Sequence, residues 1–158
     1  MGSILLVTTG ANRLTEIIST SNYPSTIIDC NAFKSRVEFL RSLHAVKEFD
    51  IMVTFRSPYL IPSEIYKRAR IAAVNIHPTW LPDYPGANPW QQMKAANETN
   101  GGVTLHHITD EADCGEIIIQ KRFEMDLRQG YNDARMKSEE LAAEILTSYL
   151  KDILPNNQ

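Results

Sequence analysis

The chain has 158 residues, of which 43% are hydrophobic and 22% charged, and its formal net charge at pH 7 is −3. This length and composition predict a single soluble domain spanning residues 1–158. The slight acidic excess gives no electrostatic reason to expect nucleic acid as a partner, and no apolar run approaches the ~20 residues of a membrane span. No signal peptide is visible, so a cytoplasmic location is expected.

Strand and helix patterns alternate along the chain. Apolar and β-branched runs predict strands at 4–8, 26–28, 50–55, 71–77, 103–108 and 117–123. Helical spacing predicts helices following Asn12 as a cap, then over 33–49, 63–70 and 88–96, and a long one ending with a stripe through 141–153. The second of these helices rests on the stripe Val37, Leu40, Leu43 and Val46. The alternation predicts a Rossmann-like three-layer α/β/α fold with a mostly parallel sheet and an antiparallel strand at one edge.

A polar pair stands at the end of the fourth predicted strand. Asn75 and His77 follow an apolar run and share one face of an extended chain, so both can point into a cleft at the carboxyl end of the sheet. Further along, Asp113 lies in the loop between the last two strands. An amide to hold a carbonyl oxygen, an imidazole to move a proton and a carboxylate are the groups needed to transfer an acyl or formyl unit to an amine. Taken singly, each residue is better explained by an ordinary structural role: Asn75 as a cap, His77 as a hydrogen-bonded histidine and Asp113 as a loop carboxylate.

Two other patterns point to different chemistry. His106 and His107 could suggest a metal site, but adjacent strand residues diverge and no further ligand has the required spacing, so no metal is expected. Cys114 beside Asp113 could be a nucleophile, but no adjacent base is evident and a packed loop cysteine is the simpler interpretation.

The ordered motifs resemble the family of formyltransferases that use 10-formyltetrahydrofolate. The residues that carry the resemblance are Asn75-Ile76-His77, Leu81-Pro82, Gly86, Gly102-Val103-Thr104-Leu105-His106 and Asp113-Cys114-Gly115. The resemblance is strongest over residues 50–122, and it implies the formyltransferase fold. This sequence departs from the family in its amino-terminal half, where about one βα unit fewer than usual is found. It also implies transfer of a formyl group from 10-formyltetrahydrofolate, as a co-substrate, to an amine, without a metal.

The same resemblance implies roles for individual residues. Asn75 would bind the formyl oxygen, His77 would pass a proton to the leaving folate nitrogen, and Asp113 would help remove a proton from the amine. His106 would support the site, and Leu81-Pro82 lies where the family often has a cis peptide. The pterin would bind to two segments: Pro58, Tyr59, Leu60 and Ile61, and Thr109, Asp110, Glu111 and Ala112. The acceptor would meet Gly10, Ala11, Asn12, Gly86 and Asn88.

Several alternatives stay open. A small acceptor of the sugar-nucleotide type is favoured slightly over a ribonucleotide-type amine, because the turn after the first strand has few glycines. Water could replace the amine, which would make the protein a formyltetrahydrofolate hydrolase. The protein could also be a relative without catalytic activity that binds a folate or a nucleotide. A homodimer is compatible with an exposed sheet edge.

Overall fold

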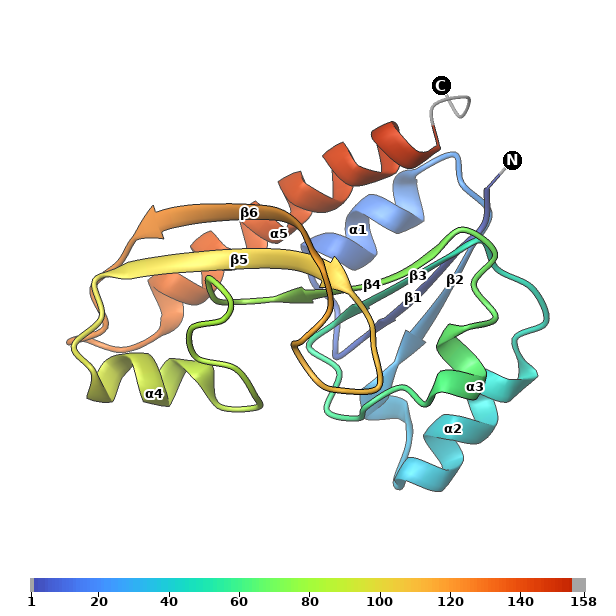
Figure 1. Cartoon of the computed structure of the whole chain (residues 1–158), viewed down its shortest axis with the longest axis horizontal. Helices are drawn as coiled ribbons and strands as arrows, with labels where there is room; N and C mark the ends of the chain where they lie inside the picture. The colour runs from blue at the N-terminus through green and yellow to red at the C-terminus, as the bar shows by residue number, and fades with distance from the viewer. Residues whose placement is uncertain (1, 155–158) are drawn as a thin grey trace.

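The computed structural model describes residues 2–154, which form one six-stranded sheet flanked by helices (Figure 1). The strands are β1 (Ile4–Thr8), β2 (Ser25–Asp29), β3 (Ile51–Phe55), β4 (Ala72–His77), β5 (Asn100–His107) and β6 (Ile117–Glu124). The helices are α1 (Arg13–Thr20), α2 (Arg36–Ala45), α3 (Ser63–Tyr66), α4 (Pro89–Ala95) and α5 (Asn132–Ile153), with a short 3₁₀ turn, η1, at Cys30–Ala32.

The sheet has the order β2-β1-β3-β4-β5-β6. The first four strands are parallel, β5 is antiparallel to β4, and β6 is antiparallel to β5. The mostly parallel sheet is therefore confirmed, but the predicted position of the antiparallel strand was wrong. β5 lies one strand in from the edge, because a hairpin returns the chain as β6. The loop of this hairpin carries Asp113 back to the carboxyl end of β4.

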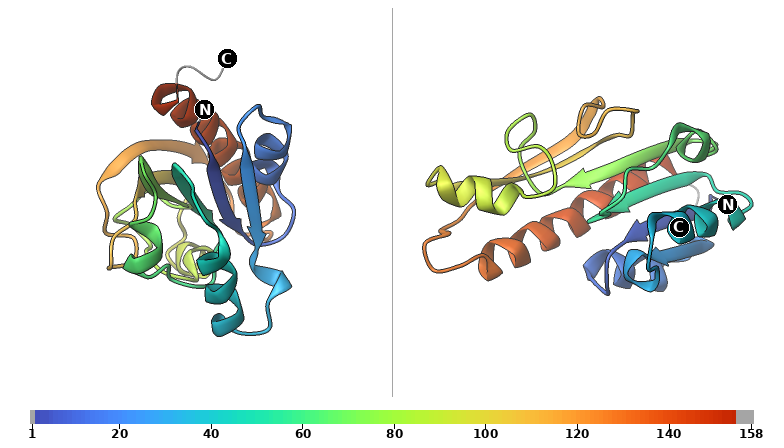
Figure 2. Two further views of the ribbon diagram at one scale, coloured as in Figure 1. Left: turned by 90° about the vertical axis from the view of Figure 1, so that its right-hand side faces the viewer. Right: turned by 90° about the horizontal axis from the view of Figure 1, so that it is seen from below.

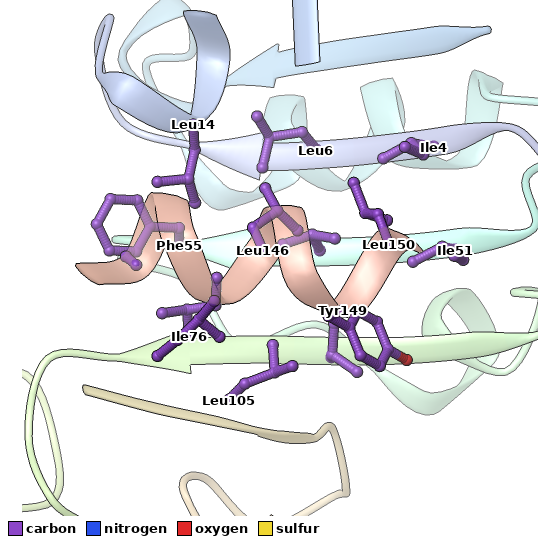
Figure 3. Close-up of a cluster of buried hydrophobic side chains, with 14 of the residues drawn as sticks. Ile4, Leu6, Leu14, Ile51, Phe55, Ile76, Leu105, Leu146, Tyr149 and Leu150 are labelled. Carbon is purple, nitrogen blue, oxygen red and sulfur yellow. The ribbon is translucent and has the colours of Figure 1, made fainter. Parts of the chain in front are cut away.

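Two helical layers enclose the sheet, as the α/β/α prediction required. α1 and α5 cover one face, while α2 and α3 cover the other (Figures 1 and 2). Alternate residues of β1 point to opposite faces of the sheet. Ile4 and Leu6 pack toward α5, and Leu5 and Val7 pack toward α2. Figure 3 shows the larger core, in which Leu146 and Leu150 of α5 lie over the strands. Burial on both faces explains the continuous apolar runs of the central strands.

Two predicted helices were too long. The helix expected over 33–49 is α2, which begins after the Ser35 cap and ends before Val46. Its buried residues are Phe39 and Leu43, whereas Val37, part of the stripe used to predict it, is 65% exposed. The helix expected over 63–70 is the four-residue α3, since the chain turns where the Arg70 N–H donates to the Phe49 carbonyl and β4 begins.

The Tyr149 hydroxyl is buried in the core without an acceptor among residues 2–154. Burial also raises the pKa of this phenol. Because an unpartnered buried hydroxyl costs free energy, Tyr149→Phe should raise the free energy of unfolding by about 1 kcal/mol, measured by urea denaturation. The matched variant is Tyr66→Phe, which removes a hydroxyl that donates to Asp110 Oδ1 at 2.6 Å and should lower stability. A less stable Tyr149→Phe protein would contradict the expectation.

Candidate active site

The site lies at the carboxyl end of β4, where three neighbouring segments meet. β4 supplies Asn75 and His77, and the β5–β6 loop supplies Asp113. In the β4–β5 pairing, Asn75 lies opposite His106. The structure therefore brings together four of the side chains singled out in the sequence, although they span 39 positions of the chain from Asn75 to Asp113.

The Asn75 amide is held in one orientation by its neighbours. Its Oδ1 accepts a hydrogen bond from Thr54 Oγ1 at 2.6 Å, and its Nδ2 lies 3.0 Å from His106 Nε2. His106 Nδ1 lies 2.8 Å from the His107 carbonyl, so Nδ1 carries the proton and Nε2 accepts from the amide. Burial lowers the pKa of His106, which favours this neutral ring. One N–H of Asn75 is thus committed to His106, and the other is left to donate to a ligand.

Thr54 is a site residue that the sequence interpretation missed. It stands in the apolar run of β3 and is 4% exposed, so it was read only as a β-branched strand residue. The register pairs it with Asn75, which becomes visible only once β3 and β4 are known to be neighbours. The only signal available was a hydroxyl within a buried strand.

Thr54→Val should lower kcat for formyl transfer on the order of tenfold, because the amide loses the donor that fixes its orientation. The change keeps the shape and β-branching of the side chain, so the strand should be preserved. Thr54→Ser keeps the hydroxyl and should restore most of the rate. Steady-state kinetics would check this, with folate affinity expected to stay constant; equal loss in both variants would instead indicate a packing role.

His77 is positioned by the loop that follows β4. Its Nε2 lies 3.0 Å from the Tyr84 carbonyl, so this nitrogen donates to the backbone. Its Nδ1 lies 3.5 Å from Asp113 Oδ1, and the side chain is only 8% exposed. A doubly protonated ring can donate at both positions, whereas a neutral ring can donate at only one. A backbone carbonyl has no sequence signal, so this partner could not have been predicted.

Asp113 reaches the site through an unusual loop conformation. Its φ is +58°, and its Oδ2 accepts from the Gly86 N–H at 2.8 Å. The loop closes where the His107 N–H donates to the Glu116 carbonyl at 2.9 Å. A Cβ on Gly115 would overlap the His107 carbonyl oxygen, so glycine is needed there. The close approach directs the Asp113 carboxylate toward His77 and, at 3.8 Å, toward His106 Nε2.

The two segments predicted to bind a pterin are connected to each other. Tyr66, which follows the first segment, donates to Asp110 in the second. Ile61 and Ile108 also belong to one hydrophobic cluster. Leu60 is 63% exposed, which leaves an apolar surface free beside these backbone groups. The arrangement is compatible with the predicted pocket, and ligand contact by these residues stays a prediction.

The residues predicted to meet the acceptor lie in different environments. Gly86 contacts Asp113, and Asn88 is an exposed residue at the start of α4. The Asn12 side chain caps α1, accepting from the Leu14 and Thr15 N–H groups. The cap predicted for α1 is therefore confirmed, but that side chain is already committed within the protein. The Leu81-Pro82 peptide is cis, as the resemblance implied.

Cys114 and the histidine pair carried other interpretations in the sequence. Cys114 is exposed, so the packed loop cysteine expected from the sequence was wrong. Desolvation and the neighbouring Glu111 carboxylate raise the pKa of this thiol, which disfavours a thiolate nucleophile. Within residues 2–154, no group of three or more His, Cys, Asp or Glu side chains is arranged to hold a metal ion. In the same part of the chain, every helix is too short or too polar to cross a membrane.

Fold and site together define an α/β protein whose polar groups suit acyl or formyl transfer at the carboxyl edge of a parallel sheet. The sequence profile of the family described as formyl transferase matches residues 3–150, so the chain belongs to the formyl transferase family. This result confirms the resemblance read from the motifs.

Individual relatives agree with this assignment. Methionyl-tRNA formyltransferase of Thermotoga maritima is 29% identical over 124 residues, which cover 78% of this chain and 38% of that protein. The chain thus matches less than two fifths of that relative's length. Phosphoribosylglycinamide formyltransferase of Streptococcus pneumoniae has the same fold, with a TM-score of 0.77, 18% identity and coverage of 98% of this chain and 99% of that one. HypX of Aquifex aeolicus in complex with tetrahydrofolic acid matches over 98% of this chain and 27% of its own, at 19% identity and a TM-score of 0.77.

Proposed function

We propose that this chain transfers the formyl group of 10-formyltetrahydrofolate to the amine of a small acceptor. The observation that carries the proposal is the Asn75 amide, whose orientation is fixed by Thr54 and His106 so that one N–H remains available beside His77. A preoriented donor of this kind stabilises the oxyanion of an acyl-transfer intermediate.

The reaction follows from the placement of the three groups. The amine nitrogen adds to the formyl carbon, and the carbonyl oxygen becomes an oxyanion that accepts hydrogen bonds from Asn75 and protonated His77. Asp113 takes a proton from the attacking nitrogen, directly or through water. The bond from the formyl carbon to N10 of the folate then breaks as His77 delivers its proton to N10. The proton held by Asp113 then passes to His77 Nδ1, 3.5 Å away, which restores both side chains. The products are the formylated amine and tetrahydrofolate.

The donor would bind along the exposed backbone of the two predicted pterin segments. A planar ring edge of alternating donors and acceptors suits backbone N–H and C=O groups. The tether between Tyr66 and Asp110 would keep the segment of residues 109–112 in place while the formyl end reaches Asn75. The acceptor would be a small molecule, since the net charge of −3 offers little attraction to a polyanion such as tRNA.

The test is an assay of the wild-type protein with 10-formyltetrahydrofolate and a panel of acceptors. The panel contains amino sugars, an amino-sugar nucleotide, glycinamide ribonucleotide, methionyl-tRNA and buffer without amine. Mass spectrometry should find one N-formyl product formed in step with tetrahydrofolate. Formate release without amine would favour a hydrolase, and transfer to methionyl-tRNA alone would refute the small acceptor. No formyl loss under any condition would refute catalysis and favour a binding protein.

A further inference from the structure

The strand order places a topological switch point next to the proposed active site. From β1 the chain passes through α1 to β2 on one side, and from β2 it passes to β3 on the other. Open α/β sheets bind ligands outside the carboxyl ends of the strands at such a switch point. Here the β1–α1 turn, Thr9–Asn12, faces the start of the β3–α3 loop, where Thr9 Oγ1 donates to the Arg56 carbonyl at 2.6 Å. β3 alone separates β1 from β4, so this switch point, called the crevice below, lies one strand away from the strand that carries Asn75.

A turn between a strand and a helix usually offers unpaired N–H groups to an anion. In this protein, N–H groups at the turn already donate to side chains of the protein. The Gly10 N–H donates to Asp29 Oδ1 at 3.0 Å, and the Asn31 N–H donates to the same oxygen at 2.9 Å. The first turn of α1 is closed in the same way by the capping box between Asn12 and Thr15.

The side chains around the turn also carry an acidic excess. Arg13 contacts Glu16 at 2.7 Å and Glu140 at 3.0 Å. Arg56 contacts Glu139 at 2.8 Å. These two arginines and three glutamates, together with the Asp29 carboxylate at Gly10, carry a formal excess of two negative charges. Each arginine is engaged by a carboxylate, so a phosphate would have to compete with these ion pairs.

We propose that Asp29 closes this crevice to phosphate, so that the acceptor amine carries no phosphate on the part that enters it. That an acceptor amine enters here rests on the proposed function. The exclusion of phosphate is a property of the turn itself. The accepted group is neutral and hydroxyl-bearing or cationic, since such groups can face the Asp29 carboxylate. Hydrogen bonds from Gly10 and Asn31 lower the pKa of Asp29, which keeps it charged at neutral pH.

The test is an NMR titration of the uniformly ¹⁵N-labelled protein with inorganic phosphate, without folate or acceptor. In the wild type, the Gly10 and Asn31 amide signals should not move at millimolar phosphate. In Asp29→Ala both N–H groups are released, and these signals should shift with saturation and at least about tenfold tighter binding than in the wild type. Asp29→Asn keeps an acceptor for the Gly10 N–H while removing the charge, so its gain in phosphate affinity should be smaller. This variant provides the test if Asp29→Ala does not fold.

The control is Asp126→Ala, which removes one negative charge from an exposed pair with Arg128. It should leave phosphate binding unchanged, which separates the local effect from net charge. Saturable phosphate binding at Gly10 in the wild type would overturn the proposal. So would folded Asp29 variants that remain as unresponsive as the wild type. Because the readout needs no catalysis, a failure of formyl transfer would leave this result interpretable.

Discussion

Replacement of Asn75 by aspartate is expected to lower kcat for formyl transfer by about 10²- to 10³-fold. Aspartate keeps the shape of the side chain and can still accept from Thr54, whose hydroxyl lies 2.6 Å from Oδ1. It loses the N–H that would bind the oxyanion, and it places a negative charge where negative charge develops. The expected signature is a fall in kcat with little change in folate affinity, measured by steady-state kinetics and calorimetry.

Two comparisons make the Asn75 result specific. Asn22→Asp makes the same chemical change at an exposed position before β2 and should leave kcat unaltered. His106→Gln provides the second comparison, because it weakens the partner of the amide while leaving the amide itself in place. The fall in kcat for His106→Gln should be smaller than that for Asn75→Asp. Nearly normal turnover in Asn75→Asp would show that the amide is not the oxyanion donor.

His77→Ala should lower kcat by about 10²- to 10⁴-fold, because the proton donor to the leaving folate nitrogen is removed. The ring lies between the Tyr84 carbonyl and Asp113, and neither contact belongs to residues 58–61 or 109–112, which are predicted to bind the pterin. Folate binding should therefore survive. Rapid-quench kinetics on the variant would show bound donor that is not consumed.

The matched control is His44→Ala, which removes an imidazole whose side chain is 52% exposed and near Glu64. It should retain full activity. If His77→Ala lost donor binding and turnover together, the ring would be a structural support rather than a proton donor. Circular dichroism of both variants would separate that outcome from a folding defect.

The candidate catalytic set could be picked out because its members stand at recognisable points of the chain. Asn75 and His77 end a strong apolar strand, and the glycine after Asp113 marks a tight loop. The fold class followed from the alternation of strands and helices. These features are local, so they are readable without knowledge of the tertiary structure.

The missed features depend on tertiary neighbours. Thr54 acquires its role only through the β3–β4 register, and the Tyr84 partner of His77 is a backbone oxygen. The use of Asp29 to occupy the β1–α1 turn likewise requires β2 to lie beside β1. The end of α2 was misjudged because apolar spacing continued past Ala45, although Val46 is already extended. The predicted stripe was right for Leu40, Leu43 and Val46, which pack in the cluster beneath α2, and wrong for Val37, which is exposed.

The central claim is that the chain contains a formyl-folate site next to Asn75. Calorimetric titration with 5-formyltetrahydrofolate, a stable mimic of the donor, tests it most directly. Saturable one-to-one binding by the wild type, retained in Asn75→Asp and His77→Ala, is the predicted result. No binding at millimolar ligand would contradict the claim, because the catalytic groups would then lack a donor site.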